Sequence, residues 1–70
     1  MASRLLRQTG MQDDRKELAR LRRIVAELAG RIHDIVEERV LSDYGELPGL
    51  SAELGAACVA YHAFRREKEL

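Results

Sequence analysis

The stretch LARLRRIVAELAGRIHDI, residues 18–35, decides the fold of this chain. Its apolar residues recur at alternating spacings of three and four, which is the a/d pattern of a heptad repeat. The series consists of Leu18, Leu21, Val25, Leu28, Ile32 and Ile35. Ile24, Ala29 and Val36 flank it and widen the apolar stripe, which favours a bundle core over a bare two-stranded coiled coil.

Cap and turn residues set the expected bounds of this helix. Asp13 and Asp14 are good N-cap residues, and Asp14 with Glu17 resembles a capping box. The next heptad position a is occupied by Arg39, so the apolar series ends there. We therefore expect a helix over about residues 13–40, preceded by a flexible basic lead over residues 1–12. Alternatively, translation begins at Met11, and the first ten residues belong to an upstream start.

A second heptad series follows a short connection. Residues 41–47 contain Ser42, Asp43 and Gly45, which favour turns and caps, and Pro48 suits the first turn of a helix. The apolar residues that follow again alternate in spacings of three and four: Leu47, Leu50, Leu54, Ala57, Tyr61 and Phe64. The sequence therefore predicts a loop over about 41–47 and a helix over about 48–67. No strand pattern occurs, so the predicted fold class is all-α.

Two helices with wide apolar stripes form a helical hairpin that leaves part of each stripe uncovered, so we expect two hairpins to dimerise into a four-helix bundle. Residues 1–23 carry a net charge of +4, residues 24–60 carry −5 and residues 61–70 carry +1. An antiparallel dimer places each basic end beside the acidic end of its partner. The charge distribution therefore favours an antiparallel homodimer.

Composition excludes several classes of protein. The 70 residues carry 12 basic and 12 acidic side chains, and this balance argues against a nucleic-acid binder held by bulk charge. A single cysteine rules out an internal disulfide framework, and no apolar run is long enough to span a bilayer. No secretory signal is visible, so a cytoplasmic protein is expected. No phosphate loop or catalytic-triad pattern occurs, so a non-enzymatic protein is expected.

One cluster of side chains has metal-ligand chemistry. His33 and Glu37 are four residues apart and share a helical face, with Asp34 beside them. A histidine with carboxylates suits a borderline divalent ion such as nickel or zinc. The competing interpretation is a solvated ion pair on the outer face of the helix. His62 is expected at the surface, and Cys58 is expected to be a small apolar residue beside the seam.

Three motifs in order resemble a known family. IHDIVE at residues 32–37, DYGELP at residues 43–48 and the pair Ala60-Tyr61 are similar to segments of the small Rop-like helical-hairpin proteins encoded among nitrogen-fixation genes. The connection here is longer than in that family, and Cys58-Val59 is less polar. The resemblance covers about residues 14–67.

The resemblance implies a dimeric helical bundle with an accessory role in nitrogen fixation, in contact with nitrogenase or its cofactor-assembly proteins. It also implies metal binding at the matching positions, which are His33, Asp34 and Glu37. A divalent-metal binder or carrier is therefore the alternative function. An RNA-binding bundle is a third interpretation, which rests on fold analogy alone.

Overall fold

The computed structural model describes the backbone of residues 2–70 and the side chains of residues 12–70. Helix α1 spans Ala2–Asp34 and continues into a π-helical turn, Ile35–Arg39. A single turn, α2, spans Val40–Asp43, and a 3₁₀ turn spans Tyr44–Glu46. Helix α3 spans Leu47–Lys68. No strand occurs in residues 2–70, so the all-α fold class is confirmed.

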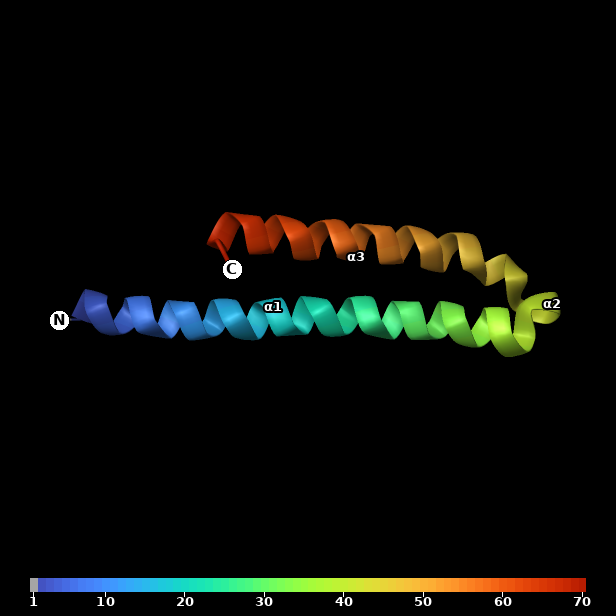
Figure 1. The fold of residues 1–70 in the computed structure, drawn as a ribbon, viewed down its shortest axis with the longest axis horizontal. Coiled ribbons are helices and arrows are strands. Elements are labelled where there is room, and N and C mark those ends of the chain that lie inside the picture. The colour runs from blue at the N-terminus through green and yellow to red at the C-terminus, as the bar shows by residue number, and fades with distance from the viewer. Residues whose placement is uncertain (1) are drawn as a thin grey trace.

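Helix α3 runs back along α1 in the opposite direction, and the connection lies at one end of the molecule (Figure 1). The Cα atoms extend over 60 × 17 × 13 Å, so the chain forms an elongated rod of two helices. The N-terminal part of α1 projects beyond the end of α3 in the same view (Figure 1).

The first helix differs from its expected bounds. It begins at Ala2 rather than at Asp13 or Asp14, and Thr9-Gly10 does not interrupt it. A single glycine inside a helix costs only about 1 kcal/mol relative to alanine, which helical neighbours on both sides can offset. The side chains of residues 1–11 lie outside the described residues, so the flexibility expected for residues 1–12 stays a prediction.

The connection also differs, because helical turns replace the loop expected over residues 41–47. The chain changes direction at two residues outside the helical region, Arg39 (φ −134°, ψ 26°) and Asp43 (φ −115°, ψ 11°). An ion pair joins them, with Arg39 Nε donating to Asp43 Oδ2 at 3.0 Å. Ser42 Oγ donates to the carbonyl oxygen of Arg39 at 3.3 Å. The reversal therefore needs no left-handed residue, and no described glycine has a positive φ.

Helix α3 starts and ends close to its expected bounds of 48–67. Pro48 lies in its first turn, where a missing N–H costs no hydrogen bond. At the other end Glu69 adopts a left-handed conformation (φ 56°, ψ 41°). The amide of Leu70 donates to the carbonyl of Arg65 at 2.9 Å, and that of Glu69 to Arg66 at 3.3 Å. This is the Schellman hydrogen-bond pattern that ends many helices.

The two heptad series form the seam between α1 and α3. All twelve seam residues are at least partly buried, but only Ile35 is fully buried, at 3% exposure. Of the residues expected to widen the stripe, Ile24 is half-buried like most of the seam, whereas Ala29 is exposed and Val36 is 54% exposed. Each helix covers only part of the apolar stripe of the other. The seam residues other than Ile35 therefore stay partly accessible to solvent.

Replacing Ile35 with alanine should destabilise the fold by about 2–4 kcal/mol, because it removes the one fully buried apolar side chain among residues 12–70. Urea unfolding followed by circular dichroism measures the change. Val59→Ala is the matched control: Val59 is 69% exposed, so its truncation should change stability by less than about 0.5 kcal/mol. Equal losses in the two variants would contradict this view of the core.

Candidate functional site

His33 lies near the connection, where α1 meets the π-helical turn. Its Nε2 is 3.1 Å from Glu37 Oε2, and its Nδ1 is 3.8 Å from Asp34 Oδ1. The side chains of all three residues are between 63% and 72% exposed. The i,i+4 spacing thus brings imidazole and carboxylate into contact as the sequence predicts, on an open surface.

The two carboxylates stand beside different ring nitrogens. A metal ion bound to His33 Nε2 and Glu37 would therefore have Asp34 beside the opposite nitrogen, outside the coordination sphere. There a carboxylate can orient the imidazole instead of ligating the ion. Among the described residues no group of three or more potential ligands converges. One copy of the chain thus offers a two-ligand pair at this position.

The connection around His33 is acidic. Residues 34–46 contain five carboxylates and one arginine, a net charge of −4. Arg39 is 3.0 Å from Asp43 and 3.9 Å from Glu38, so its charge is shared between them. This segment, here called the acidic turn, lies at the end of the molecule where the chain reverses direction (Figure 1).

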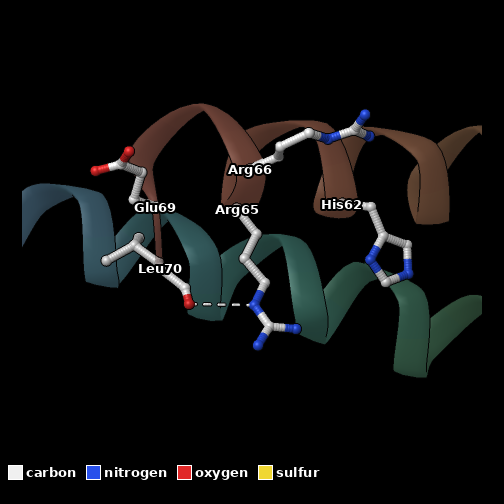
Figure 2. A pocket seen from close by; sticks show the side chains of 5 residues that line it. All are labelled: His62, Arg65, Arg66, Glu69 and Leu70. Carbon is white, nitrogen blue, oxygen red and sulfur yellow. Dashed lines mark hydrogen bonds between the residues drawn. The ribbon is translucent and has the colours of Figure 1, made fainter.

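A basic hollow lies at the opposite end, on the last turns of α3. Figure 2 shows its lining residues: His62, Arg65, Arg66, Glu69 and Leu70. Arg65 Nε donates to the carbonyl oxygen of Leu70 at 3.2 Å, which holds one guanidinium in the hollow. Arg66 extends from the other side of the helix turn in the same view (Figure 2). We did not predict this site, although His62 and Arg66 repeat the i,i+4 spacing of His33 and Glu37.

Two shallow hollows flank the seam on its opposite sides. One is lined by Ile24, Leu28, Ala56 and Ala57 together with Glu27, Arg31 and Glu53. The other is lined by Arg22, Val25, Cys58, Tyr61 and His62. Cys58 is half-buried there, beside the seam as predicted. His62 is exposed and meets Tyr61 edge to face, with ring centroids 5.2 Å apart.

An ion pair on α1 holds the one clearly perturbed carboxyl group among residues 12–70. Arg20 donates through Nε and Nη2 to Glu17 at 2.8 and 2.7 Å, in a bidentate arrangement. The hydrogen bonds from Arg20, aided by its positive charge, lower the pKa of Glu17 below its ordinary value. Both side chains are solvent-accessible, so this pair orders the surface of α1 more than it stabilises the fold.

Comparison of the chain with protein-family models, with curated proteins and with solved structures found no significant match. The resemblance to the Rop-like hairpins of nitrogen-fixation genes therefore rests on the order of the three sequence motifs.

Replacing Arg20 with alanine should raise the pKa of Glu17 toward its ordinary value, because the hydrogen bonds to the carboxylate are lost. A carboxyl group with a lowered pKa adds stability above its unfolded-state pKa and loses it as the pH falls through the folded-state value. NMR titration of the Glu17 carboxyl carbon measures the change. Arg23→Ala is the control, and an unchanged Glu17 pKa in Arg20→Ala would contradict the pairing.

Proposed function

We propose that this chain is a non-enzymatic interaction module, a helical hairpin that dimerises into an antiparallel four-helix bundle. The observation that carries the proposal is the incomplete burial of the seam. Eleven of its twelve residues stay partly exposed although α1 and α3 lie side by side. Alternating apolar residues over six positions on each helix are costly to leave in contact with water, and a second pair of helices covers them.

The accessible area of one copy leaves room for an interface of ordinary size. The chain exposes 5770 Å². A compact protein of the same 8.0 kDa mass exposes about 4,450 Å² by the usual scaling of area with mass. The excess, about 1,300 Å², is larger than the ~800 Å² that each partner buries in a standard interface. A dimer of ordinary size is therefore consistent with the area that one copy leaves exposed.

Charge supports the antiparallel arrangement. The acidic turn has a net charge of −4, whereas residues 12–23 at the other end of the helix pair have +2 and residues 61–70 have +1. An antiparallel dimer places unlike ends together, and a parallel dimer places the two acidic turns together. Salt screens such contacts, so they select the orientation while apolar burial supplies the affinity.

The dimer is tested by sedimentation equilibrium at micromolar concentration, where we expect about 16 kDa, twice the chain mass of 8.0 kDa. Ile32→Asp should yield a monomer, because it places a carboxylate in the half-buried seam at a cost of several kcal/mol. Val59→Asp, at an exposed site, is the control and should stay dimeric. A folded wild-type monomer at these concentrations would contradict the proposal.

The accessory role in nitrogen fixation rests on the three sequence motifs, and the proposed partners are nitrogenase or its cofactor-assembly proteins. No helix among the described residues is long and apolar enough to cross a membrane. The tagged chain, purified from nitrogen-fixing cells and probed with antibodies to nitrogenase and to its assembly proteins, should retain one of them. Ile32→Asp is the matched control, and equal recovery with wild type and this variant would contradict binding through the bundle.

A divalent-metal binder is the alternative function, favoured by the contact of 3.1 Å between His33 Nε2 and Glu37. Nickel or zinc suits an imidazole and a carboxylate better than calcium does. Because two ligands from an exposed face give weak binding, further ligands would come from water or from a second copy. Glu37 and His33 are the ligands, and Asp34 orients the ring.

Calorimetry with nickel and zinc salts separates the alternative from the leading proposal. Wild type should bind with micromolar or weaker affinity, and His33→Ala should lose that binding. Acid should weaken it as well, because imidazole binds a metal only when neutral. His62→Ala is the control for the second histidine. Equal binding by wild type and His33→Ala, or none by either, would remove the metal site.

A further inference from the structure

We propose that the end of the rod where the chain reverses is a docking surface for another protein, one that presents an apolar groove lined by lysine or arginine side chains. The surface consists of the exposed side chains of Val40, Leu41 and Tyr44, here called the apolar tip, and of the carboxylates of the acidic turn that neighbour them in sequence. The inference rests on the proposed function in one respect, that the chain acts by contact with another protein, and it assigns the surface through which that contact is made.

Large exposed apolar side chains concentrate at the apolar tip. Leu41 is 92% exposed, Tyr44 is 65% exposed and Val40 is 40% exposed. Val36, which is also exposed, comes four residues before Val40, and among the described residues only Val59 is a large exposed apolar side chain elsewhere. Single exposed apolar residues are common on protein surfaces, whereas a group of them within nine residues of sequence is typical of an interaction site.

The apolar tip lies outside the seam that joins α1 to α3. Its residues fall between Ile35, the last seam residue before the reversal, and Leu47, the first one after it. Val40 and Leu41 belong to α2, which forms the extreme end of the rod (Figure 1). A second copy that covers the seam would lie beside the rod, so an antiparallel dimer would present one apolar tip at each of its two ends.

Hydrogen bonds hold the backbone of the apolar tip in shape. The amide of Tyr44 donates to the carbonyl of Val40, which closes one helical turn. The ion pair between Arg39 and Asp43 spans the same turn, and Ser42 Oγ donates to the carbonyl of Arg39. A backbone that is ordered before binding loses less conformational entropy on docking than a flexible loop does. The turn therefore presents its apolar side chains on a preformed surface.

The acidic turn supplies the charge around the apolar tip. Arg39 lies within 4.0 Å of Glu38 and Asp43, so it offsets one of five negative charges. No lysine or arginine of the described residues lies within 4.0 Å of the other three carboxylates of residues 34–46. An apolar surface with a rim of carboxylates is complementary to a groove of the opposite kind, apolar within and basic around its edge.

The same charge favours a protein over a membrane as the occupant. Membrane surfaces that contain anionic lipids attract basic segments, and they repel a segment with a net charge of −4. The apolar tip also includes an aromatic side chain, Tyr44, of the kind that is enriched in protein interfaces. The occupant that fits both the apolar and the acidic side chains is thus a basic, apolar groove on a protein.

NMR titration of the isotope-labelled full chain tests the surface with a probe of the stated chemistry, a synthetic amphipathic helix of leucine and lysine. The peptide should shift the amide signals of residues 34–46 most. Leu41→Asp should weaken its binding about tenfold or more, because the substitution places a carboxylate in the apolar contact. Val59→Asp, at an exposed apolar residue away from the apolar tip, is the matched control and should bind like wild type. The same peptide with glutamate in place of lysine should not bind.

Several results would overturn the assignment. They are the absence of any shift, shifts that map to the seam, and equal binding of the peptide by wild type and Leu41→Asp. Leu41→Asp should also sediment as wild type does, since a loss of dimer in this variant would place the apolar tip inside the dimer interface. Sedimentation of the chain with phosphatidylcholine vesicles, abolished by Leu41→Asp, would assign the apolar tip to a membrane instead of a protein.

Recovery from nitrogen-fixing cells separates this proposal from the proposed function. The tagged wild type should retain nitrogenase or one of its assembly proteins, Leu41→Asp should lose it, and Val59→Asp should keep it. Equal retention by wild type and Leu41→Asp overturns the docking surface and leaves the accessory role standing. If wild type retains none of these proteins while the leucine–lysine peptide binds at residues 34–46, the accessory role fails and the docking surface stands.

Discussion

The half-covered apolar seam is the constraint on which the rest of the structure depends. Each of the two helices places an apolar residue on the seam at every third or fourth position, and side-by-side packing buries only Ile35 completely. An elongated rod of this kind buries little apolar surface in its own interior. The stripe that packs α3 against α1 is also the surface that the proposed dimer would cover, so folding and the proposed association would use one set of residues.

Periodicity predicts the seam well because burial depends on which face a residue occupies. Every residue of both heptad series is at least partly buried, from Leu18 to Phe64 along the sequence. The ends of the elements are less predictable. Asp13 and Asp14 are good N-caps, yet α1 passes through them, and the expected loop forms helical turns closed by the contact between Arg39 and Asp43. Cap preferences are worth about 1 kcal/mol, so a continuous helix readily overrides them.

The candidate site is likewise predictable from the sequence only in part. Spacing alone predicts the contact between His33 and Glu37, because i,i+4 neighbours lie on one helical face. It does not predict that Asp34 stands beside the other ring nitrogen, which depends on side-chain conformation. The basic hollow escapes prediction for a different reason. His62, Arg65 and Arg66 read as solvated surface until the left-handed end of α3 brings the carbonyl of Leu70 to Arg65.

The central claim is that a second copy completes the seam, and the concentration dependence of thermal unfolding tests it most directly. Folding coupled to association obeys mass action, so Tm should rise steadily as the chain concentration increases from about 1 to 100 μM. Ile32→Asp should lose that dependence together with most of its stability. A Tm that stays constant across the range, in a fully folded wild-type chain, would show that one copy is stable alone and would contradict the account.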